Sequence, residues 1–247
     1  MAVVFKKTQG LTDVQTHYCP GCTHGIIHRL VGEVLEELGV LGDSIGVAPV
    51  GCSVLAYKYF NCDMQEAAHG RAPACATGIK RVHPDKVVFT YQGDGDLASI
   101  GMAEIVHAAA RGEKITTIFV NNAIYGMTGG QMAPTTLPGM KTETTPYGRD
   151  IDSTGAPTKG PEMVAAVAPE GAYVARGTVA NPRQMKGFIK KALENQIAGN
   201  GFSFVECLSG CPTNWRTNNV KTWEFIEKQM PEFFKVGELR TPEKKED

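Results

Sequence analysis

Two groups of oxygen-bearing side chains each follow a short apolar run. The tetrapeptide Gly93-Asp94-Gly95-Asp96 follows residues 87–91, and Asn121-Asn122 follows residues 115–120. Both runs are typical of buried strands. A carboxylate at one strand end and an amide oxygen at the next can share one Mg²⁺ ion, which prefers oxygen ligands. The two glycines, and a helix predicted from about Leu97, would bring backbone N–H groups to phosphate oxygens. The pattern therefore predicts a magnesium–diphosphate site.

The spacing of these groups resembles the thiamine diphosphate motif, in which a GDG sequence is followed at a distance by NN. The resemblance implies that Asp94, Asn122 and the backbone carbonyl of Ile124 hold Mg²⁺ and that the metal holds the diphosphate. The alternative is that both motifs are tight turns after buried strands.

The seven cysteines include one close pair, Cys19-Pro20-Gly21-Cys22. Two thiolates at this spacing can hold one metal centre. A zinc ribbon would need a second close pair. Cys207 and Cys211 are separated by three residues and come late in the chain. A thioredoxin-like pair would follow a strand, but residues 12–18 are too polar to predict one. An iron–sulfur cluster needs four thiolates, which distant segments can supply.

Several longer segments together resemble the β subunit of 2-oxoacid:ferredoxin oxidoreductases. The resemblance extends from His17 to about Trp215. It rests on HYCPGCTHG at 17–25, GCS at 51–53, HGRAP at 69–73, GIK at 78–80 and YGMTGGQ at 125–131.

This resemblance implies a 4Fe–4S cluster, whose ligands would be Cys19, Cys22, Cys52 and Cys211. Cys211 is preferred to Cys207 because it lies in a Cys-Pro-Thr turn like that of the family, whereas Cys207 lies in an apolar run.

Three other positions near these motifs are not expected to be ligands. Cys62 and Cys75 have no motif partner and are expected to be ordinary buried cysteines. Thr23 departs from the family pattern, where glycine is usual, but it is not a ligand position.

The resemblance also implies a set of cofactor contacts around the metal site. They are Gly51, Cys52, Ser53, His69, Thr77, Gly78, Gly95, Asp96, Gly126 and Met127. Met127 would support the cofactor from beneath. His69 would contact the diphosphate or the substrate, with a catalytic role, or would make a structural hydrogen bond. His24 and His28 lie one helical turn apart and are expected to be structural.

The reaction implied is oxidative decarboxylation of a 2-oxoacid, with coenzyme A collecting the acyl group. Thiamine diphosphate supplies the nucleophilic carbon, and the cluster passes electrons to ferredoxin. We expect 2-oxoglutarate as substrate, with pyruvate and branched-chain 2-oxoacids as alternatives. Two other functions stay open, namely a cluster-free thiamine-dependent decarboxylase subunit and a structural zinc module.

The same resemblance implies a complex of several subunits. The glutamate that activates the cofactor would belong to an α subunit, so the thiamine site would lie at an interface. Further γ and ferredoxin-like δ subunits are expected, and no nucleic-acid or membrane partner.

The elements that must position these residues alternate between helices and strands. Strands are predicted at 45–50, 87–91, 115–120, 173–175 and 202–207. Helices are predicted at 23–38, 73–82, 100–110, 182–197 and 220–229. This alternation predicts an α/β fold with a doubly wound, mostly parallel sheet, which binds ligands beyond the carboxyl ends of its strands.

The remaining features concern the chain as a whole. A length of 247 residues suits one α/β domain at 1–240, followed by a charged tail at 241–247. A net charge of -1, with no apolar run as long as a membrane span and no signal-like N-terminus, indicates a cytoplasmic protein. Residues 129–161 are rich in Gly, Pro and Thr, and we expect them to form a lid or a subunit interface.

Overall fold

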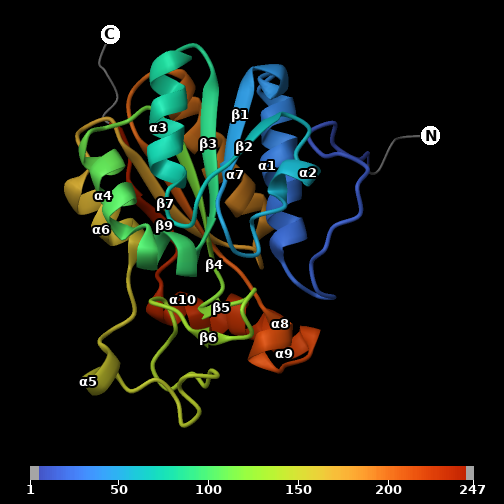
Figure 1. The fold of residues 1–247 in the computed structure, drawn as a ribbon, viewed down its shortest axis with the longest axis vertical. Helices are drawn as coiled ribbons and strands as arrows, with labels where there is room; N and C mark the ends of the chain where they lie inside the picture. Colours follow the sequence, from blue (N-terminus) through green and yellow to red (C-terminus); the bar gives the residue numbers. More distant parts are fainter. Residues whose placement is uncertain (1–5, 243–247) are drawn as a thin grey trace.

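The structure, a computed structural model, describes residues 6–242. Its centre is a seven-stranded sheet in the order β2-β1-β3-β4-β8-β7-β9 (Figure 1). The strands are β1 Ser44–Ala48, β2 Asp63–Glu66, β3 Val87–Gly93, β4 Thr116–Asn121, β7 Tyr173–Thr178, β8 Ser203–Leu208 and β9 Gly237–Arg240. All neighbouring strands are parallel except β7 and β9. The predicted doubly wound sheet is confirmed.

Helices cover both faces of this sheet. One face packs against α1 (His24–Glu37) and α7 (Pro182–Ile197), and the other against α3 (Ala72–Val82), α4 (Met102–Ala110) and α6 (Gly160–Val167). The alternation of side chains along a strand explains the two cores. In β3, Phe89 and Tyr91 belong to the first core, whereas Val88 belongs to the second.

The parallel strands end together at one edge of the sheet. The turns after β1, β3 and β4 carry Gly51, Asp94 and Asn122. Beyond this edge, at the bottom of Figure 1, lie the hairpin of β5 (Ile124–Tyr125) and β6 (Gln131–Met132) and the helices that follow β8. These helices are α8 Pro212–Trp215, α9 Asn219–Glu224 and α10 Met230–Phe233.

The long predicted elements agree with the structure, and the short ones depart from it. Helix α7 has the predicted bounds. The helix expected from about Leu97 is a π-helical segment, Asp96–Ile100, followed by α4. Two edge strands, β2 and β9, were not predicted, because both are short and only partly buried.

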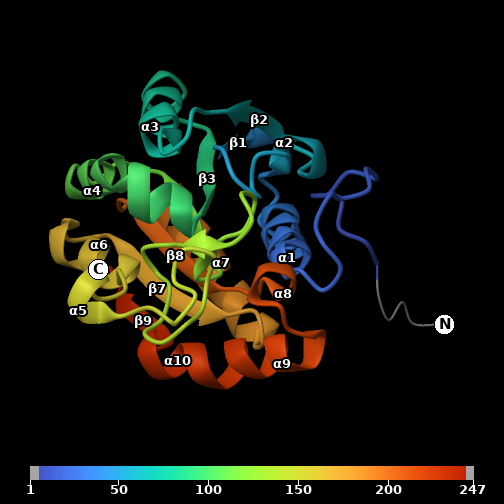
Figure 2. The ribbon, with the colours of Figure 1, turned by 60° about the horizontal axis from the view of Figure 1, so that its bottom comes forward.

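The segment 129–161 contains only β6, the short helix α5 (Ile151–Thr154) and the start of α6. Figure 2 shows it crossing the carboxyl edge of the sheet. The other short elements are α2 at Ala56–Tyr59, a 3₁₀ turn at Leu41–Asp43 and a π-helical segment at Phe225–Gln229. Residues 243–247 of the predicted charged tail lie outside the described residues, as do residues 1–5 of the N-terminal stretch.

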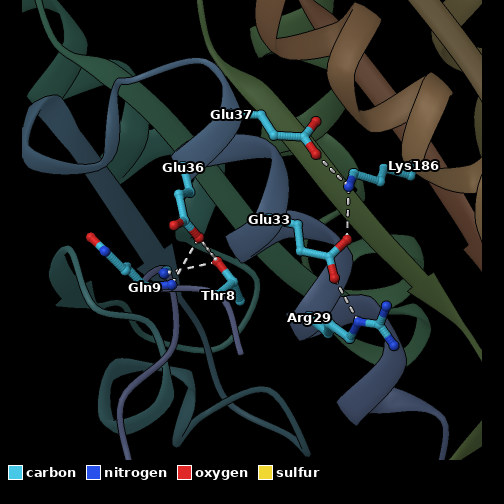
Figure 3. A network of polar contacts seen from close by, with 8 residues as sticks. Thr8, Gln9, Arg29, Glu33, Glu36, Glu37 and Lys186 are labelled. Carbon is cyan, nitrogen blue, oxygen red and sulfur yellow. Dashed lines mark hydrogen bonds and ion pairs between the residues drawn. The ribbon is translucent and has the colours of Figure 1, made fainter. Parts of the chain in front are cut away.

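Ion pairs link α1 to α7, and hydrogen bonds link α1 to the segment before it (Figure 3). Lys186 on α7 donates to Glu33 at 2.8 Å and to Glu37 at 2.6 Å. On another side of α1, the Glu36 carboxylate accepts hydrogen bonds from the Thr8 hydroxyl and the Gln9 backbone N–H.

None of the helices in residues 6–242 has the length and apolar character needed to cross a membrane.

Candidate functional site

Asp94 lies at the end of β3 and is buried. Its Oδ1 accepts a hydrogen bond from the Gly95 N–H at 2.8 Å, and its Oδ2 accepts one from the Thr135 hydroxyl at 2.6 Å. Burial raises the pKa of Asp94 to about 6, although Thr135 and the backbone N–H groups of Gly95, Ala123 and Ile124 act to lower it. The carboxylate therefore faces the turn after β4.

That turn holds the two other predicted Mg²⁺ ligands. Ala123 adopts a left-handed conformation, with φ of 58°, and so separates Asn122 from Ile124 by a sharp bend. Asn122 is buried, and its Oδ1 accepts a hydrogen bond of 3.2 Å from the Ile124 N–H. The Trp215 indole donates to the Asn122 carbonyl at 3.0 Å. Trp215, in the chain after β8, thus contacts and stabilises the turn after β4.

The preceding residue, Asn121, fixes the turn from below. Its Oδ1 accepts from the Ala123 N–H at 3.0 Å, while its amide donates to Glu206 at 2.8 Å. Glu206 also pairs with the buried Arg176, whose other carboxylate partner is Glu162. The sequence alone did not reveal Glu206 or Arg176, because their pairing depends on the register of β4, β8 and β7.

The three predicted Mg²⁺ ligands line one cavity of about 140 Å³. Its other lining residues are His24, Val50, Gly51, Cys52, Ser53, His69, Gly93, Gly95, Asp96, Tyr125, Gly126, Met127 and Thr128. Most of the predicted cofactor contacts are therefore gathered here. Thr77 and Gly78 are not among these lining residues. Both lie in α3, where the Thr77 hydroxyl donates to the Pro73 carbonyl.

Several wall residues show how closely the cavity is built. The hydroxyl of Ser53 is buried and has no hydrogen-bond partner within the described chain. A Cβ atom on Gly95 would lie 2.3 Å from the Tyr125 ring. Met127 lines the cavity and is 51% exposed.

The four predicted cluster cysteines come from three distant segments and are neighbours in space. A Cβ atom added to Gly126 would lie 3.1 Å from the Cys52 Sγ and 3.8 Å from the Cys211 Sγ. Burial, and next the charges of the Cys22, Cys211 and Cys19 thiols and of Asp94, raise the pKa of Cys52 to about 12. The pKa of Cys22 is likewise raised to about 11, first by burial and also by the Cys211 and Cys19 thiols.

Within residues 6–242, no three His, Cys, Asp or Glu side chains lie close enough to share a single metal ion. A 4Fe–4S cluster offers a separate iron atom to each thiolate, so its ligands need not converge on one point.

The three remaining cysteines lie apart from this group. Cys207 is fully buried in β8, and burial and the neighbouring Glu206 raise its pKa. Cys62 and Cys75 are only partly buried, contrary to the prediction of ordinary core cysteines. The Cys62 thiol lies 3.9 Å from the Met64 sulfur.

Thr23, where the family usually has glycine, connects two of the cluster segments. Its hydroxyl lies 2.7 Å from the Ser209 hydroxyl and accepts a hydrogen bond of 2.8 Å from the Gly210 N–H. Thr23 is the N-cap residue of α1, but its side chain makes no capping hydrogen bond to that helix. It ties the start of α1 to the turn that leads to Cys211.

His69 is held by Asp96. The Asp96 carboxylate lies 2.5 Å from the His69 Nδ1 and accepts hydrogen bonds from the Gly70 N–H and the Gln92 amide. Burial raises the pKa of Asp96, and these three partners oppose the rise. Asp96 thus orients the His69 ring at the cavity wall. A structural hydrogen bond was one of the two expectations for His69, although the sequence did not identify Asp96 as its partner.

His24 and His28 are buried among aromatic rings. His24 Nδ1 lies 2.8 Å from the Tyr91 hydroxyl, and its ring stacks on Tyr18 at 4.6 Å. His28 Nε2 lies 2.8 Å from the Tyr18 hydroxyl. Burial lowers the pKa of His24 to about 3, so this ring is neutral at ordinary pH.

A parallel α/β sheet with a GDG turn beside an NN turn defines the diphosphate-binding domain of thiamine-dependent enzymes. Residues 49–207 match the family described as the C-terminal TPP binding domain of thiamine pyrophosphate enzymes. The chain is 42% identical to the 2-oxoglutarate synthase subunit KorB of Methanocaldococcus jannaschii, across 82% of this chain and 72% of the relative. It belongs to the family of 2-oxoacid:ferredoxin oxidoreductase β subunits.

Two further similarities extend over most of the chain. It is 48% identical to the ketoisovalerate oxidoreductase subunit VorA of Methanothermobacter thermautotrophicus, over 96% of this chain, but it spans only 50% of that relative's length. A solved 2-oxoglutarate:ferredoxin oxidoreductase from Magnetococcus marinus, with 2-oxoglutarate, coenzyme A and succinyl-CoA bound, superposes with a TM-score of 0.79 at 27% identity. That match covers 97% of this chain and 86% of the other.

Proposed function

We propose that this chain holds thiamine diphosphate through Mg²⁺ in a 2-oxoacid:ferredoxin oxidoreductase. The observation that carries the proposal is that Asp94 and the Asn122–Ile124 turn line one cavity together with Cys52. The ligands are the Asp94 carboxylate, the Asn122 side-chain oxygen and the Ile124 carbonyl. All three donors are oxygens, as a hard cation prefers.

The cavity wall also fits a diphosphate. The buried Ser53 hydroxyl lacks a partner and can donate to a phosphate oxygen. At Gly51 and Gly93, an added Cβ would meet nothing within 4 Å, so the backbone there is open to close approach by an anion. The His69 ring, oriented by Asp96, offers a further contact on the same wall.

The grouped thiols of Cys19, Cys22, Cys52 and Cys211 support a 4Fe–4S cluster. Because Cys52 also lines the cavity, a cluster on these residues is held beside the cofactor. When bound, thiamine diphosphate supplies the nucleophilic carbon for decarboxylation of the 2-oxoacid, and the cluster accepts single electrons and delivers them to ferredoxin. The Cys52 turn therefore keeps the two groups adjacent.

The site on this chain supports only half of a cofactor pocket. Its volume of about 140 Å³ is small beside the roughly 300–1,000 Å³ of ordinary ligand sites. No glutamate is among the described residues that line it. Glu104 pairs with Arg71, and Glu113 is buried between Arg81 and Arg111. We therefore assign the activating glutamate to an α subunit, in a complex that also includes γ and ferredoxin-like δ subunits.

The substrate is a 2-oxoacid that reacts with coenzyme A, and 2-oxoglutarate is our first candidate. Its distal carboxylate needs a cationic partner, but the cavity lining includes no lysine or arginine among the described residues. The α subunit would supply that cation. A branched-chain 2-oxoacid needs none, and the 48% identity to relatives named for ketoisovalerate makes it the second candidate. Rates of the assembled complex with each acid distinguish the two.

The metal site is tested by Asp94→Ala and Asn122→Ala in the assembled complex, titrated calorimetrically with Mg²⁺ and thiamine diphosphate. We expect both variants to lose binding while the exposed control Asp85→Ala keeps it. Unchanged affinity in both would overturn the assignment. Acid-labile sulfide and iron in anaerobically purified protein distinguish the cluster enzyme from a cluster-free decarboxylase subunit and from a zinc module.

A further inference from the structure

Thr135 connects the long segment after β6 directly to the site. Its hydroxyl donates to the Asp94 Oδ2 at 2.6 Å, and the side chain is fully buried. The other carboxylate oxygen, Oδ1, accepts from the Gly95 N–H. Both oxygens of Asp94 thus have a fixed donor, and each keeps a second lone pair for a metal.

The next residue holds the other ligand-bearing turn. The Thr136 hydroxyl is also fully buried and donates to the Ala123 carbonyl at 2.6 Å. It accepts a hydrogen bond of 2.9 Å from the Ala133 N–H. Two successive threonines therefore contact the GDG turn and the NN turn at once, and they fix the separation of the two.

Arg149 organises the backbone that presents these threonines. Arg149 is 5% exposed, and its guanidinium donates to the carbonyls of Ala133, Pro134, Thr136 and Gly155. Among the described residues it has no carboxylate partner, and its Nε has no hydrogen-bond partner. A buried cation is costly unless such hydrogen bonds compensate, and the planar guanidinium of arginine carries enough N–H donors to reach several carbonyls together.

We propose that Thr135 is a positioning residue for Mg²⁺, which orients the Asp94 carboxylate before the metal binds. Segment 133–149 is then a fixed part of the metal site. This proposal rests on the proposed function of Asp94. Groups that orient metal ligands typically change metal affinity by about 10–100-fold when removed, so this range is expected for loss of the Thr135 hydroxyl.

The test uses Mn²⁺ in place of Mg²⁺, because the electron paramagnetic resonance signal of Mn²⁺ reports its binding without any turnover. The full chain in its assembled complex is titrated with Mn²⁺ in the presence of thiamine diphosphate. Thr135→Val removes the hydroxyl at nearly constant volume, and Thr135→Ser restores it. Thr116→Val is the matched control, because this fully buried threonine donates only to the Ala192 carbonyl.

We expect Thr135→Val to weaken Mn²⁺ binding by about 10–100-fold, while Thr135→Ser and Thr116→Val bind like the natural protein. Native-like affinity in Thr135→Val, together with loss in Asp94→Ala, would overturn the positioning role and leave the metal site intact. Equal weakening in Thr116→Val would reduce the effect to general destabilisation and would also overturn the role. Retained affinity in Asp94→Ala would overturn the proposed function itself.

Discussion

The Asn121 amide donates a hydrogen bond of 2.8 Å to the Glu206 carboxylate, and both side chains are fully buried. This contact joins the turn that carries Asn122 to an ion pair in the interior of the sheet. Glu206 also pairs with Arg176, which is fully buried. Asn121 also accepts a hydrogen bond from the N–H of Ala123, the residue of the turn with a left-handed backbone. Glu206 therefore helps to fix the conformation of this turn through Asn121.

We expect Glu206→Gln to lower the free energy of unfolding by about 3–5 kcal/mol, because it removes a partner from a buried ion pair. Arg176 would keep the Lys235 carbonyl and one described carboxylate, that of Glu162, whose side chain is 39% exposed. Glu162→Gln is the matched control, and solvent screening should make its effect smaller. Urea unfolding of the three proteins measures the difference. Equal losses would contradict the assignment of Glu206 as the main partner.

Cys211→Ser is expected to reduce the iron and acid-labile sulfide content, because a thiolate ligand is lost. Cys207→Ser should keep the cluster and show only a modest cost of placing a hydroxyl in a buried strand. Iron and sulfide analysis of anaerobically purified protein provides the measurement. The reverse result would identify Cys207 as the fourth ligand.

Gly126→Ala is expected to disturb the cluster through volume alone. The new Cβ would lie 3.1 Å from the Cys52 Sγ and 3.8 Å from the Cys211 Sγ. Gly187→Ala in α7 is the control, since its Cβ meets nothing within 4 Å and alanine favours a helix. The visible absorbance of the cluster should fall in the first variant and not in the second. Full absorbance in Gly126→Ala would show that the thiols do not need this space.

Sequence reasoning located most of this site because its motifs are contiguous and lie at strand ends. Asp94 and Asn122 could be paired before the fold was known, since parallel strands end at the same edge. Thr135, Glu206 and Arg149 could not be found in this way. Their roles depend on strand register and on the path of an irregular segment, neither of which leaves a periodic signal. Thr77 and Gly78 illustrate the opposite limit, because the family resemblance predicted them as cofactor contacts and they do not line the cavity that the structure forms.

Lys186→Met is expected to lower stability by about 0.5–1 kcal/mol at low salt, because it removes the link between α1 and α7 (Figure 3). The loss should shrink as salt rises. Lys191→Met is the control, because this more exposed lysine pairs only with Glu238. Thermal unfolding at two salt concentrations measures both.

The same ion pairs predict how the stability contributed by Lys186 changes with pH. Burial acts to raise the pKa of Glu33, but hydrogen bonds and charges from Lys186 and Arg29 hold it below its ordinary value. A carboxylate with a lowered pKa stabilises the fold above its unfolded pKa, and this stabilisation is lost as the pH falls through the lower folded pKa. The stability difference between Lys186→Met and the natural protein should therefore shrink on acidification below about pH 4.5. A difference that grows in acid would contradict this sign.

The isolated chain is expected to be inactive, because its cavity forms one side of the thiamine site. The proposed diphosphate side lies on this chain, where Asp94, Asn122 and Ile124 line one cavity, but no glutamate is among the described residues that line it. Glu104 and Glu113 are engaged with arginines elsewhere. A partner subunit must then supply the group that activates the cofactor. The measurement is 2-oxoacid-dependent dye reduction by the purified chain, reconstituted with iron, sulfide, Mg²⁺ and thiamine diphosphate, with and without the α subunit. Activity should appear only in the mixture, and an Asp94→Ala chain should fail to restore it there. Full turnover by the isolated chain would show that it contains the activating group itself.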